Sequence, residues 1–179
     1  MHIDFMRDKS TQMPVLDSPE QVLSARFWHC NFETLKPLSE CKNIEVLIIA
    51  SLPESNFDFL RDCPNLKYLS VLHLPKVAEL VGLETLRNLE TLSLSTLPSW
   101  DSSGKTQLVS SLEPIACLPR LKHLELFGVI PASKSPEALA NCALLESVRL
   151  SKYDRKAAKQ YYQSTQVSDE WAPEPVFAN

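Results

Sequence analysis

The sequence predicts a single α/β solenoid, in which short parallel strands stack into one concave sheet and irregular or helical segments return along the convex side. Three observations lead to this fold class: one apolar pattern that recurs along most of the chain, its nearly constant spacing, and an ordinary composition. Hydrophobic residues make up 44% and charged residues 22% of the 179 residues, as in folded globular proteins. A chain of this length is expected to form one domain with a substantial core.

The repeated pattern is apolar-x-x-apolar-x-apolar, as in the similar stretches "NLKYLSVLHLP" from Asn65 and "NLETLSLSTLP" from Asn88. Successive copies are 22, 22, 23, 32 and 24 residues apart, so one step contains an insertion. The alternation within each copy predicts a strand with one buried face. One such strand cannot bury its leucines alone, so neighbouring copies are expected to stack as a parallel sheet with a shared core. The first apolar slots are Val22, Ile44, Leu66, Leu89, Leu121 and Leu145.

These copies in register resemble the leucine-rich repeat family, in the form of a short bacterial-type solenoid, over about residues 20–153. The resemblance implies a right-handed solenoid with a concave parallel β-sheet and an irregular or helical convex side. One column departs from the family, which carries asparagine or cysteine three residues after the last core residue of each strand. Only Cys30 conforms, so the asparagine ladder of the family is not expected and the turns need other partners for their backbone groups. The column reads Cys30, Leu52, Leu74, Leu97, Val129 and Tyr153.

The repeats are expected to lie between two end structures that cover the solenoid core. Residues 1–18 precede the first copy and are predicted to form the N-terminal cap. Residues 19–153 hold about six repeats, with the insertion near 98–112. Residues 154–179 are predicted to form a C-terminal helix and a tail.

The C-terminal segment changes character along its length. Asp154 stands near the start of the predicted helix, where an aspartate suits the N-cap. After Gln163 the chain has two prolines and little periodicity, which predicts a loosely ordered tail. Trp171 and Phe177 are the side chains of this tail that would fold back onto the solenoid.

Prolines and asparagines mark the two ends of each strand. Prolines follow the strands and are expected where the chain leaves the sheet, because proline cannot donate to a strand ladder. Asparagines just before the first slot suit the turn that leads into the strand. The prolines are Pro53, Pro75, Pro98 and, one position later, Pro131, and the asparagines are Asn43, Asn65 and Asn88.

The side chains that alternate with the core slots are predicted to project from the concave face and to be solvated. Several are apolar or aromatic, and an exposed patch of that kind is typical of an interaction surface, with arginine at its edge as in binding hot spots. In the alternative reading, Trp28 belongs to the cap, Phe127 is covered by the insertion, and the insertion with Trp100 is a tolerated loop. Glu125 and Arg149 are expected to form a cross-strand ion pair. The candidate partner-binding residues are Arg26, Trp28, Ile48, Tyr68, Leu72, Trp100, His123, Glu125, Phe127 and Arg149.

No pattern of catalytic or metal-binding residues stands out. His29 and His73 share a column two repeats apart, about 10 Å, which is too far for one coordination shell. Phosphate-loop, hydrolase and metalloprotease motifs are missing, so we expect no enzyme activity, no metal and no cofactor. The basic stretch from Lys152 to Lys159 either contacts an acidic group or is a solvated helix face. Three cysteines occupy a core slot and are expected to be reduced and buried: Cys41, Cys63 and Cys142.

Charge and hydropathy limit the classes of partner that are expected for this chain. The formal net charge of −4 gives no field that would attract nucleic acid, and no apolar run is long enough for a membrane span. The sequence therefore predicts a cytoplasmic monomer that binds a protein partner through the concave face without catalysis. The resemblance to short leucine-rich repeat proteins suggests an adaptor or a toxin-neutralising immunity protein. The alternatives are a structural subunit that docks through its edges and tail, and an enzyme.

Overall fold

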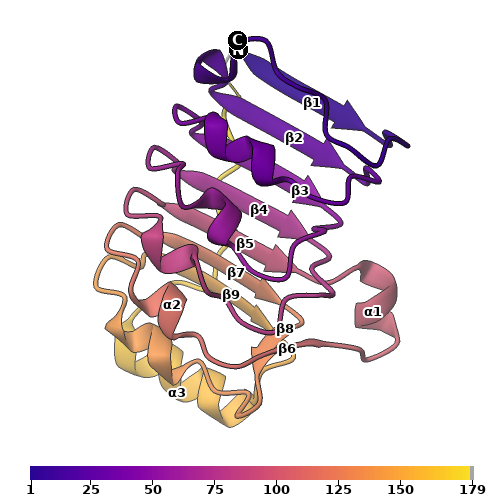
Figure 1. Cartoon of the computed structure of the whole chain (residues 1–179). Coiled ribbons are helices and arrows are strands. Elements are labelled where there is room, and N and C mark those ends of the chain that lie inside the picture. The colour runs from indigo at the N-terminus through magenta and orange to yellow at the C-terminus, as the bar shows by residue number, and fades with distance from the viewer. Residues whose placement is uncertain (178–179) are drawn as a thin grey trace.

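The computed structural model describes residues 1–177 and contains one parallel sheet that runs the length of the molecule (Figure 1). The strand order is β1-β2-β3-β4-β5-β7-β9, so each strand pairs with its neighbours in the sequence of repeats. This is the solenoid predicted from the pattern. The strands are β1 (His2–Met6), β2 (Ser24–Trp28), β3 (Val46–Ala50), β4 (Tyr68–Leu72), β5 (Thr91–Ser95), β7 (His123–Phe127) and β9 (Ser147–Ser151).

The register of the sheet follows the apolar slots. Leu47 of β3 lies opposite Leu69 of β4, and Ile49 lies opposite Val71, so the leucine columns continue from strand to strand. These four side chains are at most 1% exposed. Full burial of such a side chain stabilises the fold by about 1.5–3 kcal/mol.

The N-terminal cap region contains a strand of the same sheet. Ile3 and Phe5 of β1 pair with Ala25 and Phe27 of β2 in the repeat register. The slot that corresponds to Val22 would fall before Met1. The repeat pattern did not predict this strand because β1 keeps only two of the three apolar slots.

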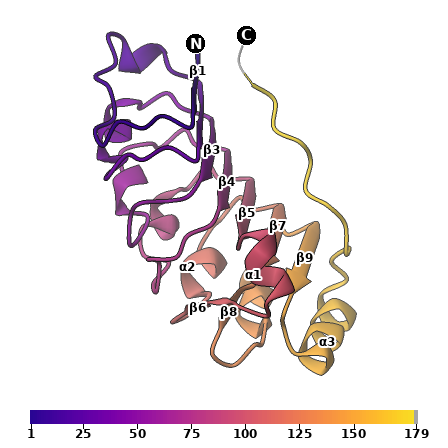
Figure 2. The ribbon, with the colours of Figure 1, turned by 90° about the vertical axis from the view of Figure 1, so that its right-hand side faces the viewer.

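The convex side consists of short helical turns, which lie together on one side of the sheet (Figure 2). Four of the turns bury a leucine of the upstream register, namely Leu38, Leu60, Leu83 and Leu139. The helix α2 buries Ile115 in the same register, whereas η1 buries none of its own residues. The turns are η1 (Pro19–Gln21), η2 (Lys36–Glu40), η3 (Asp58–Leu60), η4 (Leu83–Thr85), α2 (Glu113–Ala116) and η5 (Glu137–Asn141).

The insertion forms a small structure of its own beside the carboxyl ends of the strands (Figure 1). It begins with the helix α1 (Pro98–Ser102) and continues into β6 (Gln107–Val109), which pairs in parallel with β8 (Val129–Pro131). Pro131 was expected to mark an exit from the sheet, and it instead lies in β8. Proline is tolerated there because this second sheet has two strands and both are edges.

Asparagine side chains join successive repeats at the turns that lead into the strands. The side-chain amides of Asn43, Asn65 and Asn88 donate to carbonyl groups of the preceding repeat, over 2.8, 3.1 and 2.9 Å. These residues were predicted as turn formers only. The chain therefore has a ladder of asparagines, but in a different column from that of the family pattern.

The strand exits satisfy their backbone groups by extending the ladder by one residue. The N–H groups of His29, Ser51 and His73 donate to carbonyls of the next strand over 3.0, 2.7 and 2.7 Å. All three residues have positive φ, at 52°, 71° and 66°. This turns the chain toward the convex side without the asparagine of the family column.

The C-terminal end of the core is covered by α3 (Arg155–Thr165). Asp154 caps this helix, since its carboxylate accepts from the N–H of Ala157 at 2.8 Å. Tyr161 is 4% exposed, and the hydroxyl of Tyr162 donates to the carbonyl of Val148 in β9 at 2.7 Å. The helix thus closes the last repeat.

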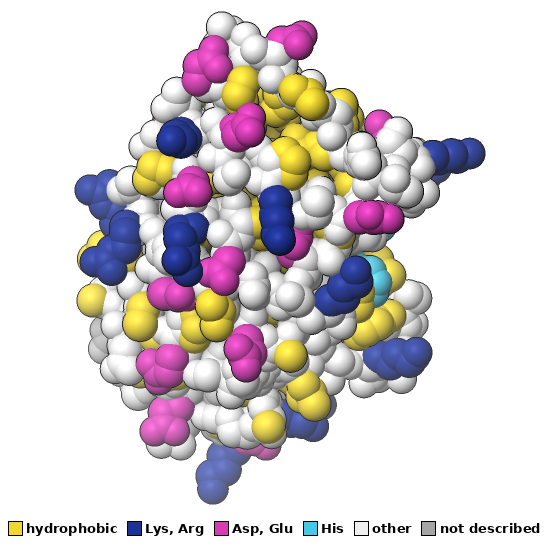
Figure 3. Space-filling model, viewed as in Figure 1, with side chains coloured by type: hydrophobic (Ala, Val, Ile, Leu, Met, Phe, Trp, Pro, Cys, Tyr) yellow, Lys and Arg dark blue, Asp and Glu magenta, His cyan; other side chains and the backbone are white. Residues whose placement is uncertain are grey.

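The surface around the helical turns is of mixed charge, with acidic and basic side chains interspersed (Figure 3). No helix within residues 1–177 is long and apolar enough to cross a membrane. Beyond α3 the tail turns back and runs along the sheet on the side opposite the helical turns, as far as Phe177 beside the first strand (Figure 2).

Candidate functional site

Three rows of side chains project from the face of the sheet opposite the helical turns, which we call the concave face. They arise because every second residue of each strand points away from the core. The first row is His2, Ser24, Val46, Tyr68, Thr91, His123 and Ser147; the second is Asp4, Arg26, Ile48, Ser70, Ser93, Glu125 and Arg149; the third is Met6, Trp28, Ala50, Leu72, Ser95, Phe127 and Ser151.

Nine of the ten predicted partner-binding residues lie in these rows, and all nine are partly exposed. The exception is Trp100, which lies in α1 beyond the carboxyl ends of the strands. Its ring packs edge-on against His73 at 5.2 Å, and the Lys105 amine lies 5.9 Å from its centre. The structure therefore brings together Arg26, Trp28, Ile48, Tyr68, Leu72, His123, Glu125, Phe127 and Arg149, without Trp100.

Several small polar side chains of these rows are buried, although the sequence predicted solvated positions. Ser24 and Ser147 are 0% and 4% exposed. Their hydroxyls are hydrogen-bonded to the imidazole Nδ1 atoms of His2 and His123, over 2.8 and 2.9 Å. Longer side chains of neighbouring strands thus cover the short ones, and the covered hydroxyls keep their partners.

The charged residues of the second row do not pair as expected. Glu125 and Arg149 are opposite in register, but the Glu125 carboxylate accepts from the Ser93 hydroxyl at 2.9 Å and from the N–H of Ala172 at 3.0 Å. Arg149 faces Asp169, with Nε 3.8 Å from the carboxylate. The predicted ion pair was wrong because the tail brings its own partners to both groups.

At the other end of this row, Arg26 donates from Nε to Asp4 at 3.0 Å. The hydrogen bond from Arg26 holds the pKa of the Asp4 carboxyl below its usual value. Arg26 is therefore tied to β1, a strand that the sequence reading treated only as part of a cap.

Two aromatic residues of the third row, Phe127 and Trp28, lie against the tail and the first strand. Phe127 lies beside Trp171 of the tail, with ring centres 5.5 Å apart. Trp28 is a member of β2, opposite Met6 of β1 in register, and its ring lies 5.5 Å from that of His29. It contacts the N-terminal segment while remaining a strand residue of the concave face.

The histidines at the strand exits form no metal site. His29 shares a hydrogen bond with Ser51 at 2.8 Å, while Nδ1 of His73 is buried without a hydrogen-bond partner. Burial, with the nearby His29, lowers the pKa of His73. The described part of the chain holds no cluster of His, Cys, Asp and Glu that could bind a metal ion.

The three core-slot cysteines are buried as expected. The Cys63 thiol donates to the carbonyl of Leu38 at 3.4 Å, and burial raises its pKa to about 12. A thiol with so high a pKa is almost entirely protonated at neutral pH and is a weak nucleophile.

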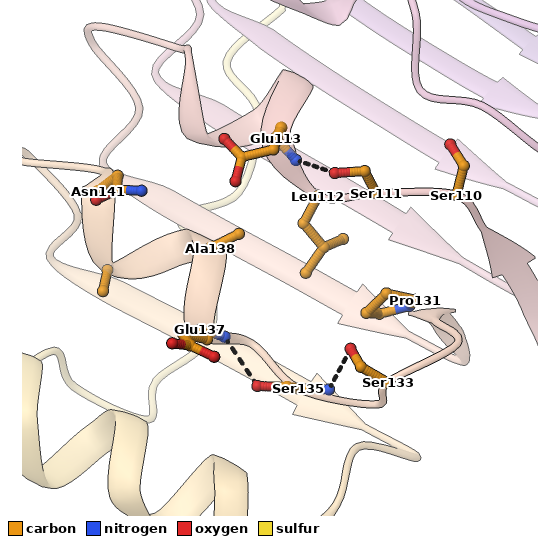
Figure 4. A pocket seen from close by; sticks show the side chains of 11 residues that line it. Ser110, Ser111, Leu112, Glu113, Pro131, Ser133, Ser135, Glu137, Ala138 and Asn141 are labelled. Atoms are coloured by element: carbon orange, nitrogen blue, oxygen red, sulfur yellow. Dashed lines mark hydrogen bonds between the residues drawn. The ribbon is translucent and has the colours of Figure 1, made fainter.

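A hollow of about 570 Å³ lies between α2 and η5, on the convex side (Figure 4). Three of the four serine hydroxyls that line it accept from backbone N–H groups. Ser111 accepts from the N–H of Glu113 at 3.0 Å, and Ser135 accepts from that of Glu137 at 3.2 Å. The hollow thus lies at the starts of two helical turns, where these hydroxyls bond to the backbone of the turns.

The sequence reading left the tail residues outside its set of site residues, although it named Trp171 and Phe177 as side chains that would fold back. The structure places Trp171 on Phe127 and Arg149, and Phe177 beside His2, with ring centres 4.7 Å apart. The available signal was the presence of two large aromatics in a polar segment with prolines. Nothing in the tail sequence indicates which residues of the solenoid these aromatics contact.

Comparison with known proteins supports the fold. No protein-family model and no curated protein matches this chain. Among solved structures, a chain described as internalin C2 from Listeria monocytogenes, a leucine-rich repeat protein, is similar with a TM-score of 0.56 and 24% identity. The match covers 74% of this chain and 53% of the other, so this chain spans about half the length of the matched structure.

Proposed function

Since this chain is a leucine-rich repeat solenoid, we propose that it is a non-enzymatic binding module that takes a partner protein on its concave face. The observation that carries the proposal is the third row of the face, in which Trp28, Leu72 and Phe127 are partly exposed on alternate strands. Solvated aromatic and apolar side chains in one row are typical of interaction surfaces.

The chemistry of the neighbouring rows supports the same proposal. Tyr68 and Ile48 extend the apolar surface, and Arg26 and Arg149 lie at its ends. Aromatic residues and arginine contribute most to binding at protein interfaces. The parallel ladder holds these side chains at fixed spacing, which lowers the conformational entropy lost on binding.

We further propose that the biological role is that of an adaptor or a toxin-neutralising immunity protein. Both roles require capture of a protein without chemistry. Identification of the captured partner separates them, because an immunity protein would retain a toxic enzyme or pore-former and an adaptor would retain components of a larger assembly.

The test is a pull-down from the source cell with tagged full-length protein. Wild type is compared with a Trp28→Ala, Tyr68→Ala, Phe127→Ala variant, after circular dichroism has shown that the variant folds. The matched control carries Leu108→Ala and Leu144→Ala, two apolar side chains 55% and 50% exposed outside the seven-stranded sheet. We expect one protein to be retained by wild type and control and lost by the concave variant.

A partner retained equally by wild type and the concave variant would refute binding at this face. That result would favour the structural-subunit alternative, in which the chain docks through an edge. The observation behind this second candidate is that, within residues 1–177, β1 pairs with β2 alone and is one of the two edge strands of the sheet. Exposed backbone groups on an edge strand can pair with another chain.

A further inference from the structure

Residues 168–177, which we call the strap, cross the concave face from the last strand to the first. Ser168 pairs with the edge of β9, since its carbonyl accepts from the N–H of Val148 and its N–H donates to the carbonyl of Glu146, both at 2.9 Å. From there the strap runs along the sheet to the N-terminal end (Figure 2), where Phe177 lies against His2. The strap therefore occupies part of the surface assigned above to a partner, where it contacts Glu125, Phe127 and Arg149.

Arg149 is the main anchor of the strap. Its guanidinium carbon lies 4.2 Å from the centre of the Trp171 ring, and its Nε faces the Asp169 carboxylate at 3.8 Å. The same indole lies beside the Phe127 ring. A guanidinium that stacks on an aromatic ring and also faces a carboxylate recognises an acidic residue two positions before an indole.

The second anchor is Glu125, which binds the main chain of the strap. The N–H of Ala172 donates to the Glu125 carboxylate at 3.0 Å, and the Ser93 hydroxyl donates to the same carboxylate. A contact with the main chain requires an extended segment at this point and does not depend on the side chain of residue 172.

The strap is weakly held. Trp171 and Val176 remain 66% and 84% exposed, and Pro173 and Pro175 have no N–H to offer to a ladder. Within residues 1–177, Ala172 makes the only hydrogen bond between the backbone of residues 169–177 and the sheet. Beyond Ser168, the strap therefore has few buried contacts and one backbone hydrogen bond to the sheet, and these are the properties of a segment that opens at low cost.

We propose that the strap is a built-in ligand of the concave face, and that an external partner displaces it with an extended acidic segment that carries an aromatic side chain. The proposal rests on the proposed function and adds the chemistry of the partner. The strap itself shows that chemistry: residues 168–177 contain three carboxylates, two large aromatic side chains and no lysine or arginine. The strap competes with any such partner and lowers its apparent affinity.

The size of this competition follows from effective concentration. A strap tethered at millimolar effective concentration and closed about nine-tenths of the time corresponds to a Kd of about 0.1 mM for the same segment in trans. Because only the open tenth can bind, the apparent Kd of wild type would be about 1 mM. Removal of the strap anchor should therefore tighten binding by up to about tenfold.

The test uses full-length protein and a synthetic peptide with the sequence of residues 167–177, VSDEWAPEPVF, titrated by NMR against labelled protein. In wild type we expect nuclear Overhauser contacts between Trp171 and Phe127. Trp171→Ala should bind the peptide about tenfold tighter than wild type, while Val176→Ala should bind like wild type. Arg149→Gln added to Trp171→Ala should abolish the gain, and a peptide with the Trp171→Ala change should bind no variant.

Two results would overturn the proposal: no contact between Trp171 and Phe127 in wild type, or equal peptide affinity for wild type and Trp171→Ala. The proposed function fails separately. The strap contacts and the tenfold gain could be observed while Trp171→Ala retains no protein in the pull-down. In that case the strap would be confirmed as an intramolecular ligand, and the proposal of an external partner would be refuted.

Discussion

Replacement of Gly82 by alanine should destabilise the solenoid strongly, because this glycine touches the backbone of the preceding repeat. Gly82 has φ of 98° and stands just before η4. A Cβ at this position would lie 2.5 Å from the N atom of Asp58 and 2.7 Å from the carbonyl oxygen of Phe57, and would also clash with the carbonyl carbon of Phe57. These are main-chain atoms, which cannot rotate away.

The expected cost has two parts. An alanine in left-handed backbone costs about 1–2 kcal/mol, and forced displacement of well-packed neighbours adds typically 1–3 kcal/mol. We therefore expect Gly82→Ala to lower the free energy of unfolding by about 3 kcal/mol. For a chain of this size, each kcal/mol lowers Tm by about 2–4 °C, so Tm should fall by about 6–12 °C.

Gly104 provides a matched control. It also has positive φ, at 74°, but nothing lies within 4 Å of the position of its added Cβ. Gly104→Ala should cost only the backbone part, about 1 kcal/mol, or about 2–4 °C in Tm. Thermal denaturation followed by circular dichroism measures both. Equal Tm values for the two variants would refute the argument, because they would mean that the contact between repeats at Gly82 costs nothing to displace.

Three further perturbations test other parts of the fold. Asn65→Ala removes one rung of the asparagine ladder and should cost about 0.5–1.5 kcal/mol, measured by urea denaturation. Asp154→Ala removes the cap of α3 and should cost about 1 kcal/mol, with faster amide exchange in that helix. The third perturbation is a rise in pH, because burial raises the pKa of three cysteine thiols above that of the same thiols in the unfolded chain. The unfolded chain therefore loses the thiol protons at lower pH, and the free energy of unfolding should fall as pH rises from about 9 to about 12. The thiols are those of Cys41, Cys63 and Cys142, with pKa values raised to about 11, 12 and 11.

Each of these tests has an internal comparison. Lys156→Ala changes an exposed position in α3 and should leave the amide exchange rates of the helix as in wild type. If Asp154→Ala also exchanged at the wild-type rates, the capping role of Asp154 would be contradicted. An Asn65→Ala variant as stable as wild type would show that the ladder contributes nothing. For the alkaline effect, the exposed Cys117 serves as control: Cys117→Ser should keep the wild-type slope, and a flat profile in wild type would contradict the buried thiols.

The sequence alone determined the solenoid and most of its register. Leucines such as Leu47, Leu69 and Leu92 recur at a spacing that only stacked parallel strands can bury together, and the pattern is local, so it survives in the sequence. The concave rows followed from the same alternation. This is why nine predicted surface residues lie together, although the pattern carries no information on what binds them.

The tertiary structure decided the contacts between segments far apart in the chain. The partners of Arg149 and Glu125 come from residues 169–172, and Ile3 and Phe5 join β2 although they lack a complete repeat. The tail has no periodicity, and its position depends on an arginine, a phenylalanine and a glutamate contributed by β7 and β9. Local spacing fixes which face of a strand is buried, whereas the covering of the opposite face depends on complementarity between surfaces that exist only after the solenoid has formed.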